Sequence, residues 1–287
     1  MQRCEQRGLH LKGEFRIPSL ICSSRFTVDS QILRVTAQEL GWETLRLDGN
    51  EFPDWFEALD DQIAFFYTAP HVFDLAAQLG RSMIGCNSDW TIDLSHDLLK
   101  RELRQVTLEE ALRIAGPQFV KDSVSKAFPA EVYEAQRLAE TTKTIPLGSL
   151  VHVGEPVDWQ SEFRCFVAKG EVTTMSRYLY EGQLLTDDQS LRRVPDDQLS
   201  EAREFATSVI NHPEVPIPDA FVLDVGEIRD RGWAVVECNE CWASGIYYCD
   251  PVKVLATLLS GSCRTAELEA KWDFRQTYSQ ARQQNFK

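Results

Sequence analysis

The stretch FVLDVGEIRDRGWAVVECNE, residues 221–240, holds two short apolar runs joined by a polar turn. The first run ends at Asp224 and the second at Glu237, with Asn239 two positions further on. Each run has the length and composition of a strand, and the turn between them predicts an antiparallel pair. Side chains alternate along a strand, so Glu237 and Asn239 point to one face while Cys238 points to the other. We expect Asp224 on the partner strand to bring a third oxygen alongside them.

Asp224, Glu237 and Asn239 would together offer two carboxylates and one amide oxygen. These are hard ligands of the kind that Mg²⁺ prefers, in an octahedral set completed by water and nucleotide phosphates. For any single acidic residue at a strand end, the alternative is a solvated side chain without a ligand. Three oxygens on one face weaken that alternative, so the sequence predicts a magnesium site at which the ion bridges phosphates.

Basic side chains on other predicted strands could hold those phosphates. Lys121 ends a short apolar strand, and Lys126 follows five residues later. Two ammonium groups can hold a polyphosphate as point charges, although a single lysine is more often part of the solvated surface. Arg164 lies in the middle of an apolar strand and shares a face with Glu162, so it needs a charged partner. The structural alternative for Arg164 is a salt bridge to Glu162 or to another acid of the sheet.

Taken in order, these motifs resemble the ATP-grasp superfamily. The segments that carry the resemblance are Phe-Val-Lys at 119–121, Val-Gly-Glu-Pro-Val at 153–157, Glu-Phe-Arg-Cys-Phe-Val at 162–167, Leu-Asp-Val at 223–225 and Glu-Cys-Asn at 237–239. The interval from Asp224 to Glu237, 237 − 224 = 13, matches that of well-known members. Among the branches, the sequence is most similar to the clade named for one arginine and two lysines. The resemblance covers about residues 93–262.

The resemblance implies a nucleotide site between two lobes. The residues that it assigns to ATP are Lys121 and Lys126 for the phosphates, Glu155 and Val157 in the hinge that pairs with adenine, Asp158 for the ribose, and Lys100 on the helix before the small lobe. Two departures affect the phosphate end. Residues 121–129 contain no glycine, unlike the glycine-rich loop of many members, and Val222 stands where several ligases have an arginine.

The same resemblance implies the chemistry. Asp224, Glu237 and Asn239 would hold one or two Mg²⁺ ions, and Arg164 and Arg177 would face the γ-phosphate or an acyl phosphate. ATP would phosphorylate a carboxylate, and an amine would then attack the acyl phosphate, releasing ADP and forming an amide or peptide bond. Metal ions and basic groups stabilise such a transfer by neutralising charge, so no protein nucleophile is required.

The loop after Asn239 is a candidate substrate site. Through Trp242, Ser244 and Gly245 it would offer backbone amides to a substrate carboxylate or phosphate. The alternative is a plain turn before a helix that starts near residue 250. The acid and the amine could be small molecules or peptides, and the sequence identifies neither.

The predicted fold class is α/β, or α+β, with four segments. Residues 1–92 alternate short strands and helices and predict a small parallel α/β lobe in front of the ATP-grasp core. Residues 93–157 predict the small ATP-grasp lobe, beginning with helices at 93–103 and 107–115, the second capped by Thr107 and Glu110. Residues 158–262 predict the large lobe, including a hairpin turn at Lys169 and Gly170 and a helix at 198–210. Residues 263–287 read as a polar tail without chemistry.

Bulk properties exclude several function classes. The chain has 287 residues and a net charge of −14, which argues against general binding to nucleic acid or to anionic membranes. From the sequence we expect no signal peptide and no membrane span, since no apolar run is near the roughly 18 residues needed to cross a bilayer. Eight scattered cysteines then predict reduced thiols in a cytoplasmic protein. A homodimer is the default expectation for such an enzyme.

Two alternatives remain open from the sequence. Cys238 and Cys241, with Cys249, have a Cys-x-x-Cys spacing that could bind zinc or act in redox chemistry, but a fourth zinc ligand would have to be Cys263 or a distant histidine. A kinase-like or non-catalytic protein of the same fold could keep the Mg-ATP site without joining an acid to an amine. No nucleophile motif of a hydrolase is present.

Overall fold

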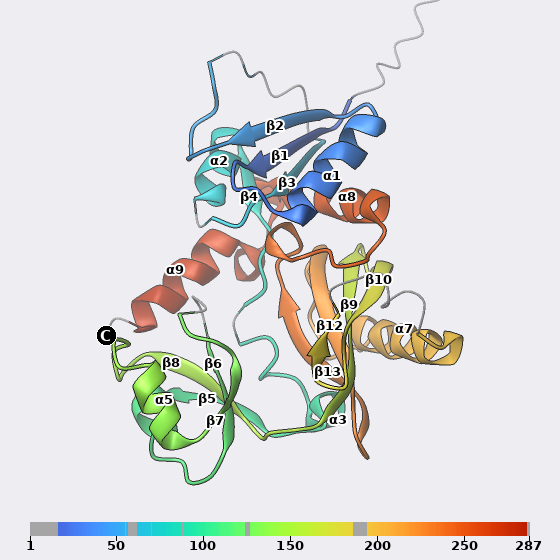
Figure 1. Cartoon of the computed structure of the whole chain (residues 1–287). Helices are drawn as coiled ribbons and strands as arrows, with labels where there is room; N and C mark the ends of the chain where they lie inside the picture. The colour runs from blue at the N-terminus through green and yellow to red at the C-terminus, as the bar shows by residue number, and fades with distance from the viewer. Residues whose placement is uncertain are drawn as a thin grey trace, which may run out of the picture.

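A computed structural model describes residues 17–54, 56, 62–69, 71–87, 89–123, 127–185 and 194–285. Four sheets organise these residues, and Figure 1 shows the three larger ones as an N-terminal sheet at the top, a small sheet at the lower left and a large sheet at the right. No helix in the described ranges is long and apolar enough to cross a membrane. The chain has the mixed α/β architecture that the sequence predicts.

The N-terminal sheet is parallel, as predicted. Its strands are β1 (Ser19–Ser23), β2 (Glu43–Leu47) and β3 (Ile63–Phe66) in the order β2-β1-β3, with helices α1 (Val28–Glu39) and α2 (Val72–Gln78). Residues 20–22 of β1 are apolar and buried, as expected for the central strand of a parallel sheet. Thr27 and Ser30 form a capping box that starts α1.

The small sheet is antiparallel and lies below the N-terminal lobe. Its strands are β5 (Leu103–Thr107), β6 (Gln118–Asp122), β7 (Glu131–Tyr133) and β8 (Leu150–Gly154) in the order β5-β8-β6-β7. Helices α4 (Leu108–Ala111) and α5 (Ala135–Thr141) accompany it. Leu108, Val120, Leu138, Val151 and Val153 form its separate core.

The helices predicted at 93–103 and 107–115 are wrong in extent. The structure has a short α3 (His96–Leu99), then strand β5, then the single turn of α4. β5 lies mostly in the interval between the two predicted helices and pairs with β8 along its whole length, so a strand set by tertiary pairing separates them. The predicted cap is confirmed, since Thr107 and Glu110 form a capping box at the start of α4.

The large sheet carries the quoted stretch. Its strands are β9 (Trp159–Ala168), β10 (Glu171–Tyr180), β11 (Gln183–Leu184), β12 (Ala220–Ile228) and β13 (Gly232–Asn239) in the order β11-β10-β9-β12-β13. The hairpin at Lys169 and Gly170 is confirmed, and both residues have the positive φ that this tight turn requires. Helix α7 (Asp196–Ile210) packs with the buried apolar face that includes Phe163 and Cys165.

The segment after residue 250 returns to the N-terminal lobe. Its elements are α8 (Pro251–Leu259), β14 (Ser262–Arg264) and α9 (Phe274–Asn285), together with the short 3-10 turns η2 (Thr265–Glu267) and η3 (Ala270–Trp272). The 3-10 turn η1 (Cys241–Ala243) precedes this segment. β14 pairs with β4 (Arg81–Met83). In Figure 1, α9 runs from below the N-terminal lobe toward the small lobe. The predicted tail is therefore integrated into the fold.

Candidate ATP site

Two cavities lie between the small sheet and the large sheet and meet at one ion pair. The smaller, of about 340 Å³, extends along the hinge residues Glu155–Val157. The larger, of about 610 Å³, extends toward the N-terminal lobe and α9. Lys121 and Glu237 line both cavities. A ligand with an apolar end at the hinge could therefore pass the ion pair and reach the larger cavity.

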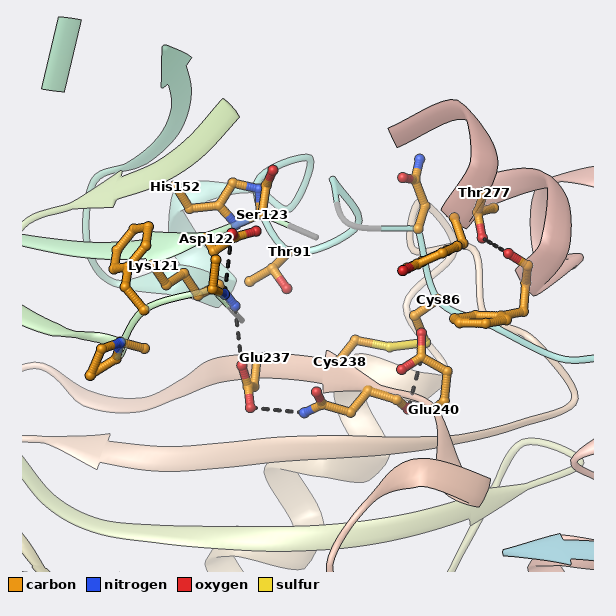
Figure 2. A pocket seen from close by; sticks show the side chains of 18 residues that line it. Cys86, Thr91, Lys121, Asp122, Ser123, His152, Glu237, Cys238, Glu240 and Thr277 are labelled. Carbon is orange, nitrogen blue, oxygen red and sulfur yellow. Dashed lines mark hydrogen bonds and ion pairs between the residues drawn. A yellow bond between two sulfur atoms is a disulfide. The ribbon is translucent and has the colours of Figure 1, made fainter. Parts of the chain in front are cut away.

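Asp224, Glu237 and Asn239 are brought together by the β12–β13 pairing. Asp224 lies opposite Glu237 in the ladder. The Asn239 side-chain amide donates to Glu237 Oε1 at 2.8 Å and lies 3.5 Å from Asp224 Oδ2. The Lys121 Nζ reaches Glu237 Oε2 from β6 at 3.1 Å (Figure 2). The three predicted ligands thus converge, and a lysine of the opposite sheet lies beside them.

This donor set fits a magnesium ion. A positively polarised NH₂ group sits between two carboxylate oxygens, at the point where a small cation would be attracted. The oxygen and nitrogen of an asparagine amide can exchange places by a flip, so Asn239 can present Oδ1 to the same point. Two carboxylates and an amide oxygen are appropriate ligands for Mg²⁺, which takes its remaining ligands from water and phosphate.

Arg164 is the buried cation of the site. Its Nε and Nη2 donate to both oxygens of Asp224, at 3.0 and 2.6 Å, and Nη1 donates to the Gly245 carbonyl at 3.0 Å. Tyr178 and Tyr247 stack on each other with ring centres 4.8 Å apart and flank the guanidinium. Burial alone would lower the pKa of Arg164, but the Asp224 carboxylate raises it above its usual value. The alternative of a salt bridge to an acid of the sheet is confirmed, with Asp224 as the partner.

Sequence reasoning missed two charged residues of the smaller cavity. Glu162 accepts a hydrogen bond from the Tyr178 hydroxyl, and burial raises the pKa of this carboxyl to about 7. Arg101 donates to the carbonyls of Val235 and Val236, and burial lowers the pKa of its guanidinium to about 10. The shared face of positions 162 and 164 was a signal for Glu162, whereas no local pattern distinguished Arg101 from its neighbours.

The other residues that the resemblance assigned to ATP differ in whether they line a cavity. Glu155 and Val157 line the smaller cavity, as the hinge prediction requires. The side-chain hydrogen bond from Arg231 lowers the pKa of Glu155. Asp158 instead forms an exposed ion pair with Arg229. Neither Asp158 nor Lys100 lines the two cavities, and Lys126 lies outside the described residues.

Arg177 lies away from Arg164. It pairs in register with Phe163, whose side chain is on the α7 face of the sheet, and its Nη1 donates to Gln198 of α7 at 3.1 Å. Residues opposite each other in an antiparallel pair share a face, so Arg177 and Arg164 project to opposite sides. The structure does not bring Arg177 to the predicted magnesium ligands.

The loop after Asn239 makes contacts that support the site. Gly245 uses its carbonyl to hold Arg164, and the neighbouring Ile246 N–H donates to Asp29 of α1 at 3.0 Å. The Ser244 hydroxyl donates within the loop to the Glu240 carbonyl. Trp242 is 2% exposed, and its Nε1 donates to a backbone carbonyl at 2.7 Å. These contacts give the three predicted substrate residues structural roles.

The expectation of eight reduced thiols is wrong for one pair. Cys86 and Cys238 form a disulfide between the segment after β4 and strand β13, because the two segments cross at the floor of the larger cavity (Figure 2). The zinc alternative is also wrong. Cys241 and Cys249 are buried and apart from this pair, and burial raises the pKa of their thiols to about 12 and 11. Within the part of the chain that is described, no three histidine, cysteine, aspartate or glutamate side chains gather to hold a metal.

Comparison with known proteins agrees with this geometry. The fold is that of an ATP-grasp protein. The model of an ATP-grasp domain family, family 2 of the clade named for one arginine and two lysines, matches residues 98–257, which is more than half of the chain. The chain therefore belongs to this family, and the resemblance inferred from the motifs is confirmed. No curated protein matches the sequence.

Solved structures share the fold at low sequence identity. D-cycloserine synthetase DcsG is 14% identical with a TM-score of 0.50, over 84% of this chain and 98% of that one. The D-alanine–D-alanine ligase of Bacillus anthracis is 15% identical with a TM-score of 0.49, over 85% and 97%. A RimK domain ATP-grasp protein of Sphaerobacter thermophilus is 16% identical with a TM-score of 0.48, over 85% and 97%. At these identities the likeness shows the fold alone.

Proposed function

We propose that this protein binds Mg-ATP between the small and large sheets and uses it to join a carboxylate to an amine through an acyl phosphate. The observation that carries the proposal is the meeting of Lys121 from one sheet with Glu237 and Asn239 from the other. A phosphate-binding cation and candidate metal ligands face each other across the cleft. The Lys121–Glu237 ion pair then marks the place where the polyphosphate enters, because both groups exchange their mutual contact for the nucleotide and its metal.

The smaller cavity suits the adenine ring. Leu103, Phe119 and Trp159 supply apolar walls, and the hinge supplies backbone groups for the ring edge. Arg101 lies with its guanidinium 5.0 Å from the centre of the Trp159 ring, so the indole is held in place. The base would therefore occupy the closed end of the cleft, with its phosphates directed toward Lys121.

Arg164 lines neither cavity, but it holds Asp224 beside Glu237 and Asn239 and would supply positive charge behind the proposed phosphate position. When bound, magnesium supplies positive charge that neutralises the transferred phosphate and aligns it. Arg164 is held by three hydrogen bonds, so its charge is already oriented when the substrate arrives. Preorganised charge of this kind contributes most of the catalysis in such transfers, so the reaction needs no protein nucleophile. The substrates would be small-molecule or peptide acids and amines.

Lys121→Ala is expected to lower ADP formation by about 100-fold, since a group that stabilises the transferred phosphate is removed. The measurement is ADP release with pooled carboxylic acids and amines, with the exposed Lys253→Ala as the matched lysine control. ADP that appears only when acid and amine are both present would support the ligase. ADP with a stable phosphorylated product and no amide would favour a kinase-like protein, and bound but uncleaved ATP would favour a non-catalytic one.

A further inference from the structure

Asp29 is a carboxylate of the N-terminal lobe that reaches a loop of the large lobe. It lies in the first turn of α1, where the capping box of Thr27 and Ser30 fixes the backbone. Its Oδ2 accepts a hydrogen bond from the Ile246 N–H at 3.0 Å, across 217 positions of sequence. Figure 1 shows α1 in the lobe above the large sheet. A residue outside the matched ATP-grasp segment is thus tied to the loop that follows the predicted magnesium ligands.

The same loop holds the guanidinium of Arg164. The Gly245 carbonyl accepts from Arg164 Nη1 at 3.0 Å, and the centre of the Tyr247 ring lies 4.9 Å from the guanidinium carbon. A methyl group on Gly245 would lie 3.2 Å from Asp29 Oδ2 and 3.7 Å from Arg164 Nη1. The carboxylate and the guanidinium therefore both occupy the space that a side chain at position 245 would need. Residues 245–247 form a short bridge between these two charged groups.

The bridge contains a strained residue. Tyr247 has a φ of 47°, in the left-handed region that a residue other than glycine enters at a cost of about 1–3 kcal/mol. Such a conformation persists only where neighbouring contacts hold it. The bond from the Ile246 N–H to Asp29 holds the backbone on one side, and the stacking of Tyr247 on Tyr178 holds the ring. Loss of the Asp29 bond would allow the loop to relax away from Arg164.

We propose that Asp29 is a positioning residue for phosphoryl transfer, which acts by fixing residues 245–247 and through them the charge of Arg164. This inference rests on the proposed function, because that charge has a task only if ATP is cleaved at this site. The two hydrogen bonds from Arg164 to Asp224 do not depend on Asp29. Nucleotide binding should therefore survive the loss of Asp29, and the effect should fall on the transition state.

The test compares binding of Mg-ADP to the full chain with and without aluminium fluoride, which mimics a phosphoryl group in transfer. Calorimetry measures the gain in affinity that the fluoride gives, and wild type is expected to gain at least about 100-fold. A displacement of about 1 Å can cost as much as about 100-fold, so Asp29→Ala should lose at least about tenfold of this gain. Its affinity for Mg-ADP alone should stay within about twofold of wild type.

Three further variants show how Asp29 acts. Asp29→Asn keeps an oxygen that can accept from the Ile246 N–H and should retain most of the gain. Gly245→Ala would crowd the Asp29 carboxylate and should lose the gain, which provides a second test if Asp29→Ala does not fold. Asp97→Ala removes an exposed carboxylate from the first turn of α3 and should behave like wild type.

The outcomes separate the two proposals. Folded wild type that binds no Mg-ADP rejects the proposed function. Mg-ADP binding by wild type without a gain from aluminium fluoride overturns the role of Arg164 and, with it, that of Asp29. A full gain in both Asp29→Ala and Gly245→Ala overturns the role of Asp29 alone. So does an equal loss in Asp29→Asn and Asp29→Ala, because the charge of Asp29, and not its bond to the loop, would then be what matters.

Discussion

Asp224→Ala is expected to lower the free energy of unfolding by about 3–5 kcal/mol, because it leaves the Arg164 guanidinium buried without its partner. Asp224 is fully buried, and Arg164 is 8% exposed. The variant removes two charge-assisted hydrogen bonds at once, at 3.0 and 2.6 Å. Chemical denaturation of wild type and variant at neutral pH measures the difference.

Two further variants separate stability from function. Asp158→Ala breaks an exposed aspartate–arginine pair and should change stability little, since solvent screens such pairs. The double variant Arg164→Met/Asp224→Leu replaces the buried pair with apolar side chains and should recover most of the stability that Asp224→Ala loses. It should still fail to bind Mg-ATP. An Asp224→Ala protein as stable as wild type would contradict the buried ion pair.

Glu162 is expected to make the protein less stable as the pH rises from about 4.5 to about 7. Burial is the largest cause of its raised pKa, which is about 7 in the fold and 4.5 in the absence of the fold. Between these values the folded protein retains a proton that the unfolded chain has lost. The stability that the neutral carboxyl provides is complete below the lower value and is lost as the pH rises through the upper one. The full change is on the order of 3 kcal/mol.

Glu162→Gln removes this titration while keeping an acceptor for the Tyr178 hydroxyl. Denaturation curves measured from about pH 5 to about pH 8 should show a smaller loss of stability for the variant than for wild type. Above the upper pKa the variant should be the more stable protein. Parallel pH profiles for the two proteins would show that Glu162 does not retain its proton in the fold.

The convergence of Asp224, Glu237 and Asn239 was predictable because their geometry is local. A single hairpin turn fixes the pairing of β12 and β13, so strand alternation alone places Glu237 and Asn239 on one face beside Asp224. The sequence also predicted that Arg164 has a charged partner, because a guanidinium in an apolar strand must be paired. The choice of Asp224 over Glu162 depended on strand order, which local sequence does not specify.

Other residues depended on long-range structure. The resemblance assigned Arg177 to the transferred phosphate, but the register that sets it opposite Phe163 turns its side chain to the α7 face of the sheet. Trp242 and Phe274 are far apart in the sequence and meet only because the chain returns to the N-terminal lobe. β5 lay mostly between two predicted helices and was not predicted as a strand, because its strand character comes from pairing with β8. Each error arose where a distant segment, and not a neighbouring residue, decided the structure.

The most direct test of the central claim is calorimetric titration of ATP with and without magnesium. Wild type should bind ATP in a magnesium-dependent manner, and Glu237→Gln should weaken that binding by at least about tenfold, as expected when a metal site loses a ligand group. The exposed Glu171→Gln serves as the matched control and should bind like wild type. Folded wild type that binds no ATP, or binds it equally without magnesium and in Glu237→Gln, would contradict the assignment of the site.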